Sequence, residues 1–336
     1  MALLPPDKTA VPGSEEEKRL LAQGEKYFDQ GEYELALQEV QAVIEINPDN
    51  VEGLYALASS YMALDDYDKS LQSCKRAARY PSKYLPEIYL LTGRAYRRLD
   101  DPWNALRTYR YAAGVYPENS TIHFRLGETY VYLDKLELAA DSFKAAIRTN
   151  PKNAAAHFEL GVLYHKNDYI TPALLSFSTV LLLEPGKAEA PLIPGAIENL
   201  LLREQVNSTN TDEGDFRSVQ AALVRNTEVS RKTVDTVFAG KQEVSKQAAF
   251  EIQKEQYHVL LKELNAAKIK SQDKSFVVNT YVPLYNDIYE QGLTDIFVYY
   301  IFQGGKDGAA RSWLNNHSDE VKKLEQLVEH HLRKKG

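Results

Sequence analysis

A repeat of 34 residues constrains the fold of this chain more than any other feature of its sequence. Pro117, Pro151 and Pro185 lie 34 positions apart, and each follows a stretch with apolar residues at helical spacing. Proline ends a helix because it lacks an N–H donor and disfavours helical geometry in the preceding residue. The dipeptide Asn47-Pro48 marks an earlier stop of the same kind. The period therefore predicts a series of similar helical units along the chain.

Each period contains two helical patterns, with small residues where the two helices are expected to meet. Steps of three and four residues place the patterned side chains on one face of each helix. Gly127 and Ala139 are expected at the close approach of one helix pair, and Gly161 and Ala173 at that of the next. The fourth unit carries Leu126, Gly127, Tyr130, Ala139, Phe143 and Ala146, and the fifth carries Leu160, Gly161, Tyr164, Ala173, Phe177 and Val180.

This pattern resembles the tetratricopeptide repeat (TPR), a helix–turn–helix unit of 34 residues. The resemblance covers residues 17–187 and implies an all-α solenoid of five repeats. Repeat arrays end in a capping element with a polar outer face. We expect a capping helix at 188–206, with its apolar side formed by Ile193, Ile197, Leu200 and Leu201.

The rest of the chain carries helical patterns without the 34-residue period. We expect a disordered segment at 1–16, a polar linker at 207–215 and a small helical C-terminal domain at 216–336. The segment around Tyr281-Val282-Pro283-Leu284-Tyr285 resembles the C-terminal region of bacterial extracytoplasmic TPR proteins, and an ordinary aromatic helical core explains it equally well. The helices expected in this domain span 216–238, 241–268, 275–291, 294–303 and 318–334.

The family resemblance implies that the first helix of each repeat lines a concave groove for a protein or peptide. Chaperone-tail binders of the family clamp a carboxylate there with Lys and Asn. Leu21, Glu25 and Ala56 occupy three of those positions here, so that clamp is absent. An aromatic and arginine-rich groove remains, which fits a segment with acidic and apolar residues. The predicted partner-binding residues are Tyr55, Met62, Leu90, Arg94, Arg97, Arg98, Phe124, Arg125, Tyr132, Phe158 and His165.

The sequence carries no catalytic, phosphate-binding or metal-ligand motif, so we expect neither an enzyme nor a bound cofactor or metal. The net charge of −7 argues against nucleic-acid binding. No apolar run reaches the length of a membrane helix, so membrane insertion is not expected. Cys74 occurs at a packing position and is expected to be buried.

We therefore predict a non-enzymatic scaffold or adaptor that binds a partner in the groove. The alternative is a structural or autoinhibited module whose C-terminal domain occupies the groove. The resemblance of the C-terminal region favours a bacterial periplasmic or cell-envelope location, with a signal peptide absent from this chain, over a cytoplasmic one. The sequence predicts neither the partner nor the oligomeric state.

Overall fold

The structure, a computed structural model of the chain, forms two compact units, residues 1–149 and 150–336. Every regular element among the residues that it describes is a helix, as the sequence predicts. The described residues are 6–9, 13–185, 192–201, 216, 218–223, 225–226, 244–266, 275–303 and 309–333.

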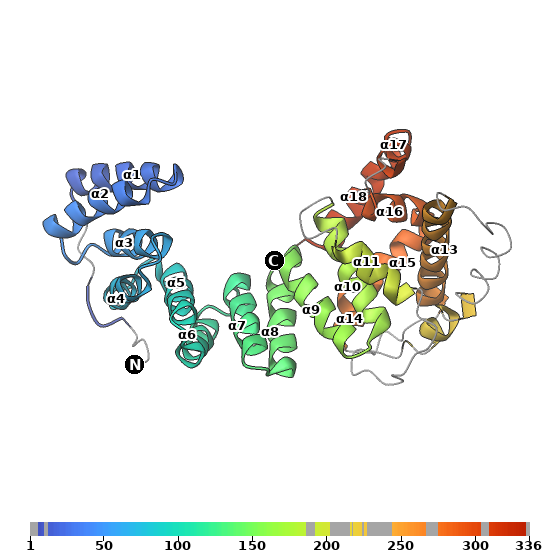
Figure 1. Cartoon of the computed structure of the whole chain (residues 1–336), viewed down its shortest axis with the longest axis horizontal. Coiled ribbons are helices and arrows are strands. Elements are labelled where there is room, and N and C mark those ends of the chain that lie inside the picture. The colour runs from blue at the N-terminus through green and yellow to red at the C-terminus, as the bar shows by residue number, and fades with distance from the viewer. Residues whose placement is uncertain are drawn as a thin grey trace. The chain divides into compact units, whose positions relative to one another are not determined.

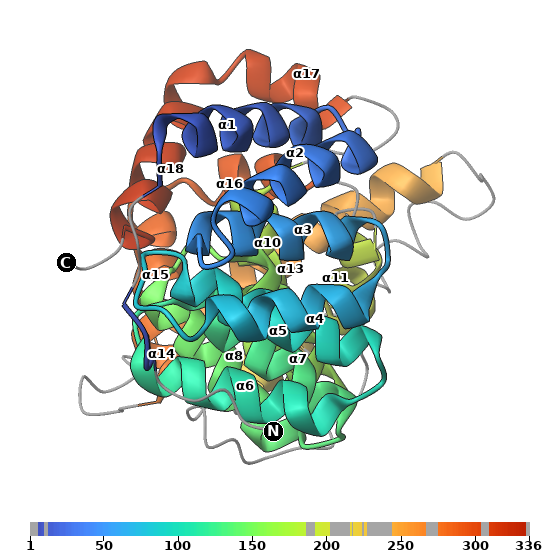
Figure 2. The ribbon, with the colours of Figure 1, turned by 90° about the vertical axis from the view of Figure 1, so that its left-hand side faces the viewer.

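The first unit consists of four helix–turn–helix repeats (Figure 1). Each helix contacts the next one along the chain, and Figure 2 shows α1 to α6 following one another in chain order. We call the first helix of a repeat helix A and the second helix B. The helices are α1 (Glu15–Asp29), α2 (Tyr33–Ile46), α3 (Val51–Ala63), α4 (Tyr67–Ala77), α5 (Leu85–Arg98), α6 (Pro102–Val115), α7 (Ser120–Tyr132) and α8 (Leu136–Thr149).

A glycine on helix A allows the two helices of a repeat to touch. A Cβ atom on Gly127 would lie 2.5 Å from a ring carbon of Phe143, and one on Gly93 would lie 2.3 Å from the ring of Tyr109. The sequence correctly predicts a close approach at Gly127. The atoms nearest to that glycine belong to Phe143, one helical turn beyond the expected Ala139, because the aromatic ring lies over the missing side chain.

The turn between helices A and B has the same backbone conformation in every repeat. Its left-handed residue is Gly31 in the first repeat and an aspartate in the other four: Asp65, Asp100, Asp134 and Asp168. Aspartate tolerates positive φ better than most residues do. In two repeats the next aspartate, Asp66 or Asp101, accepts a hydrogen bond from the backbone of the following helix. The carboxylates of Asp66 and Asp101 therefore cap helix B of their repeats.

The N-terminal segment differs from the disordered segment that we expect at 1–16. Ser14 caps α1 and exchanges hydrogen bonds with Glu17, so this helix begins at Glu15. Before it, the backbone N–H groups of Asp7 and Lys8 both donate to the carbonyl of Arg79. The Asp7 carboxylate also pairs with the Arg79 guanidinium at 3.1 Å. Residues 7 and 8 are thus held against the end of α4.

The second unit contains the fifth repeat together with the C-terminal helices. The fifth repeat is formed by α9 (Ala154–Lys166) and α10 (Ile170–Leu183). Short α17 is absent from our sequence predictions, because seven residues are too few to show a period. The remaining helices are α11 (Leu192–Leu201), α13 (Val244–Ala266), α14 (Phe276–Thr280), α15 (Val282–Glu290), α16 (Thr294–Ile301), α17 (Ala309–Asn315) and α18 (Ser318–His331).

Helix α10 is the centre of the second unit, and every residue from Ile170 to Leu182 is buried. Two of its polar side chains are satisfied by tyrosines of the C-terminal helices. The Ser178 hydroxyl lies 2.7 Å from that of Tyr257, and the Thr179 hydroxyl lies 3.0 Å from that of Tyr285. The two compact units consequently divide between the fourth and fifth repeats.

Helix α11 contacts α10 and lies within 188–206, the range in which we expect a capping helix. Its apolar residues Ile193, Ile197, Leu200 and Leu201 are all buried, as their spacing predicts. The linker expected at 207–215 lies outside the described residues.

Candidate functional site

Most of the predicted binding residues lie on the A helices of the first unit, and these helices contact one another in sequence order. Helix α3 contacts both α1 and α5, and α5 contacts α7. We call the side chains of α1, α3, α5 and α7 that meet along this row, together with Tyr84 at the start of α5, the A-helix surface. It includes Tyr55 from α3, Leu90, Arg94, Arg97 and Arg98 from α5, and Phe124, Arg125 and Tyr132 from α7.

Arginines from two neighbouring A helices meet around one carboxylate. The Nη1 atom of Arg125 lies 2.7 Å from Oε2 of Glu128, and Nη1 of Arg97 lies 4.0 Å from the same oxygen. The sequence analysis did not assign Glu128 to the site, because it follows Arg125 by three residues and resembles an ordinary intrahelical partner. Its position shows that the arginines of α5 and α7 lie close together.

Aromatic rings lie beneath three of these guanidinium groups. The Arg97 guanidinium carbon is 5.6 Å from the centre of the Tyr132 ring, and that of Arg125 is 5.4 Å from the Phe124 ring. Arg98 lies 5.7 Å from the ring of Tyr67 on α4. Such cation–π contacts hold an arginine side chain in place while its N–H donors remain available.

The charges of Arg94, Arg97 and Arg125 all affect the pKa of one buried tyrosine, Tyr109. Burial raises the pKa of Tyr109 well above its usual value, and the positive charges of Arg125, Arg97 and Arg94 partly oppose that rise. The Tyr109 hydroxyl donates to the carbonyl of Leu90 at 3.3 Å. The positive charges of three arginines therefore act on the same buried hydroxyl group in the third repeat, that of Tyr109.

Tyr132 is the most exposed aromatic residue of the predicted site, with 57% of its surface accessible. Its hydroxyl donates to the carboxylate of Asp100 at 2.8 Å, which fixes the ring although it is exposed. Phe124 is half-buried against Phe143 at a ring distance of 5.8 Å.

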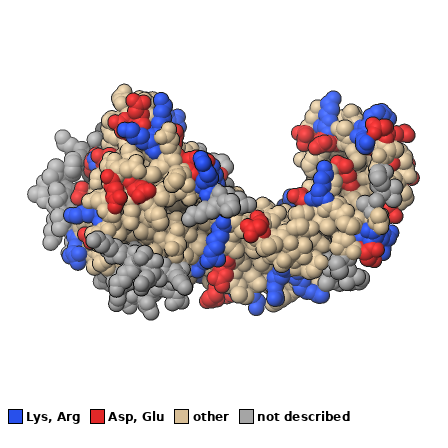
Figure 3. Space-filling model, turned by 180° about the vertical axis from the view of Figure 1, so that it is seen from behind, with Lys and Arg blue, Asp and Glu red and all other residues tan. Residues whose placement is uncertain are grey.

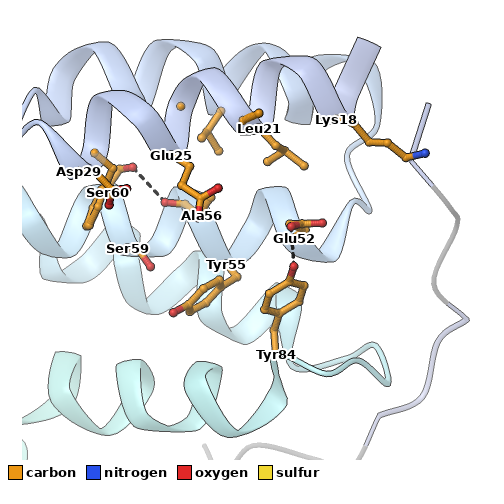
Figure 4. A pocket seen from close by; sticks show the side chains of 14 residues that line it. Lys18, Leu21, Glu25, Asp29, Glu52, Tyr55, Ala56, Ser59, Ser60 and Tyr84 are labelled. Carbon is orange, nitrogen blue, oxygen red and sulfur yellow. Dashed lines mark hydrogen bonds between the residues drawn. The ribbon is translucent and has the colours of Figure 1, made fainter. Parts of the chain in front are cut away.

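A pocket of about 370 Å³ opens between α1 and α3 (Figure 4). Its apolar wall contains Leu21 and Phe28 of α1 together with Tyr55. Tyr55 stacks on Tyr84 with ring centres 5.4 Å apart, and the Tyr84 hydroxyl donates to the carboxylate of Glu52. Sequence reasoning missed Tyr84, because it lies at the N-cap of α5, outside the A-helix positions that the family uses.

One predicted site residue of the first unit is buried in its core, and two others belong to the second unit. Met62 is only 4% exposed, so its apolar side chain belongs to the core and not to the groove. Phe158 and His165 lie on α9 in the second unit, where both are partly buried and their rings approach Phe177 at 6.1 and 6.5 Å. The structure brings Tyr55 and the residues of α5 and α7 onto one surface, of which buried Met62 is not part.

Comparison with known sequence families agrees with this arrangement. Family models described as "TPR repeat" and "Tetratricopeptide repeat" match residues 24–65 and 127–168, and residues 51–84, respectively. Residues 51–84 span the helix pair α3 and α4, and each of the other two segments begins within a helix A and ends after the next helix A. These segments of the chain are tetratricopeptide repeats.

Several solved structures are similar to parts of this TPR chain. MamA 41-end from Desulfovibrio magneticus RS-1 is 19% identical, with a TM-score of 0.45, and the match covers 52% of this chain and 98% of that one. A thermophilic TPR protein from Thermus thermophilus, TTC0263, is 23% identical, with a TM-score of 0.44 and coverage of 56% and 100%. PilF from Pseudomonas aeruginosa is 18% identical, with a TM-score of 0.48 and coverage of 70% and 97%. A comparison with curated proteins finds no match.

TPR arrays act as protein-interaction modules, and the chain is assigned to this general class. Over the described part of the chain, no three His, Cys, Asp or Glu side chains are placed to hold a metal ion together. No described helix combines the length and apolar character needed to cross a membrane. Charged side chains of both signs are interspersed over the described surface in Figure 3.

The single cysteine of this TPR protein lies in the core of the first unit. Cys74 is fully buried, and burial raises the pKa of its thiol to about 12. A thiol with such a pKa is protonated at neutral pH and unreactive, which agrees with the packing role expected from the sequence.

Proposed function

We propose that this TPR protein is a non-enzymatic scaffold or adaptor that binds an extended or helical protein segment on its A-helix surface. The observation that carries the proposal is that Arg97 and Arg125, from two helices, both lie close to the carboxylate of Glu128. The charge of Arg94 acts on the same buried tyrosine, Tyr109, as the charges of these two arginines. The local charge is positive, although the whole chain is acidic. A partner carboxylate bound there would relieve the mutual repulsion of the arginines.

The chemistry of the surface indicates what such a segment contains. Guanidinium groups held over aromatic rings can donate paired hydrogen bonds to carboxylates, so acidic side chains suit the arginines. Tyr132 offers a large ring with a fixed orientation, and Tyr55 offers another on α3. Rings of this kind act as apolar anchors in protein interfaces. We expect a segment that combines Asp or Glu with aromatic or aliphatic residues.

The test uses a double charge reversal in the full chain, Arg94→Glu with Arg98→Glu. Binding of a fluorescent synthetic peptide rich in Glu, Phe and Leu is measured by anisotropy at low and high salt. We expect the variant to bind at least about tenfold more weakly and to respond less to salt, because fewer charge pairs remain. Thermal melts should change little, since exposed charges contribute little to stability.

A matched control reverses two exposed arginines of helix B in the same repeat, Arg107→Glu with Arg110→Glu. The net charge change is identical, so a long-range effect would weaken both variants equally. Wild-type affinity of the Arg94/Arg98 variant at both salt concentrations would exclude the arginines from the binding site. Failure of the wild-type chain to bind any such peptide would favour the alternative, in which the C-terminal helices occupy this surface.

A further inference from the structure

The pocket between α1 and α3 carries charge opposite to that of the arginine cluster. Glu25 and Asp29 of α1 and Glu52 of α3 line it, and Lys18 is the one cation of the lining. Lys18 already pairs with Glu15 at 2.6 Å, and in Figure 4 its side chain points away from Glu25. Within the described part of the chain, neither Glu25 nor Asp29 forms an ion pair.

The field of these carboxylates reaches the aromatic rings of the pocket. Burial raises the pKa of Tyr84 far above its usual value, and its hydrogen bond to Glu52 and the charges of Glu52 and Glu25 add to the rise. Burial also raises the pKa of Tyr55, and Glu87 of α5 contributes. Acidic side chains from three successive A helices therefore add to the rise in the pKa of these stacked tyrosines. Lys83 lies over the Tyr84 ring at 4.9 Å.

We infer that this pocket binds a lysine or arginine side chain of the same segment whose acidic residues bind the arginine cluster. The long apolar stem of such a side chain matches the wall of Leu21, Phe28 and Tyr55, and its charged head matches Glu25 and Asp29. The partner is thus a bipolar segment, basic at one end and acidic at the other. This inference rests on the proposed function.

The spacing between the two ends follows from the order of the helices. Adjacent packed helices lie about 8–10 Å apart, so the pocket at α1 and α3 is about 20 Å from the arginines of α5 and α7. An extended chain covers about 3.3 Å per residue, so about six residues separate the basic from the acidic end. We therefore expect about six residues between the basic end and the acidic end of the partner segment.

Four synthetic peptides of about twelve residues, a length set by the extended-chain rise, test the inference with the full chain. The bipolar peptide has two lysines and three glutamates separated by about six apolar and small residues, and is made in both orders. In the acidic peptide the lysines are replaced by glutamine, and a scrambled peptide has the bipolar composition with alternating charges. We expect the better bipolar order to bind about tenfold more tightly than either other peptide.

The variant Glu25→Lys with Asp29→Lys should remove this tenfold advantage and should not weaken binding of the acidic peptide. The neutral pair Glu25→Gln with Asp29→Asn should reduce the advantage by a smaller factor. A control with the same net charge, Glu34→Lys with Glu45→Lys on exposed positions of α2, should leave it unchanged. Melting curves establish that each variant is folded.

Two results would overturn the inference: equal affinity for the bipolar and acidic peptides, or an advantage that persists in the Glu25/Asp29 variant. Either result leaves the proposed function standing, provided that Arg94→Glu with Arg98→Glu still weakens the acidic peptide. Loss of the arginine effect, in contrast, contradicts the proposed function itself.

Discussion

The ring of His157 and the hydroxyl of Tyr281 are joined by a buried hydrogen bond of 2.8 Å across 124 positions of sequence. The other ring nitrogen of His157, Nε2, lies 2.9 Å from the carbonyl oxygen of Pro151. A carbonyl can only accept, so Nε2 carries the proton and Nδ1 accepts from Tyr281. The fifth repeat is thereby linked to the C-terminal helices through a neutral histidine.

This pair makes the stability of the second unit depend on pH. Burial lowers the pKa of His157 from 6.5 to about 4. Between these values the unfolded chain binds a proton that the folded chain does not, so stability falls as the pH is lowered from about 6.5 to 4. We expect a loss of roughly 2–3 kcal/mol at His157 over this range.

Hydrogen exchange in α9 and α15, measured at several pH values, tests this expectation. His157→Gln should be less stable than wild type at pH 7, and the difference should shrink as the pH falls. Tyr281→Phe should cost about 1–3 kcal/mol at pH 7, because it leaves Nδ1 buried without a donor. A constant difference between wild type and His157→Gln from pH 7 to 4 would contradict the prediction.

A second prediction concerns the contact of helices A and B. Gly127→Leu should destabilise the first unit by about 2 kcal/mol or more, because its Cβ alone would overlap the Phe143 ring. Gly114→Ala on α6 is the matched control. No atom lies within 4 Å of a Cβ there, so this change should stabilise the helix by about 0.5–1 kcal/mol. Denaturant melts of the two variants should shift in opposite directions.

A third prediction concerns the buried carboxylate of Glu17, which is only 4% exposed. Its Oε2 accepts hydrogen bonds from the amides of Asn50 at 2.6 Å and Asn47 at 3.0 Å. These bonds, together with that from the Ser14 backbone, lower the pKa of Glu17 from 4.5 to about 2. The stabilisation is complete above pH 4.5 and is lost as the pH falls to 2.

Glu17→Gln preserves the shape of the side chain but cannot accept all of these bonds. We expect it to cost about 1–3 kcal/mol at pH 7, measured by denaturant unfolding. The cost should decrease below pH 4.5 as wild-type Glu17 loses its advantage. An exposed neighbour provides the control: Glu16→Gln should change stability little at any pH.

A fourth prediction uses the left-handed residue of the turn between α7 and α8. Asp134 has a φ of 53°, which β-branched residues adopt only with strain. Asp134→Val should therefore cost about 1–2 kcal/mol, whereas Asp134→Asn should be nearly neutral. Thermal melts compare the two. Equal midpoints would show that the turn relaxes to another backbone conformation.

The repeat fold was predictable from sequence because each unit contains both helices of a pair and the residues through which these two helices touch. The period places a glycine and an aromatic ring in the same register in the third, fourth and fifth repeats, so local pattern and tertiary contact coincide. The C-terminal helices were predictable as helices only. Their packing depends on hydroxyl pairs such as Thr179 with Tyr285, which are separated by 106 positions and follow no period.

The surface that we propose for binding was predictable from sequence only in part. The family positions identify Tyr55 and the arginines of α5, because these lie on the outer face of helix A. They do not identify Tyr84, which reaches the pocket from the N-cap of α5. They also include Met62, which is buried in the core. A repeat consensus does not specify which turn residues contribute side chains to a surface. It also does not specify the local packing that buries a residue such as Met62.

Because α10 is buried on all sides, it limits where a further repeat could be added to the array. Repeat arrays lengthen when a unit is duplicated, and a new unit needs an uncovered helix face on which to stack. Helix α10 has no such face, because α11 and the C-terminal helices already cover it. A sixth repeat could not be appended after Leu183 without displacing them. Within the described structure, a repeat could therefore be added without displacing these helices only before the fifth repeat.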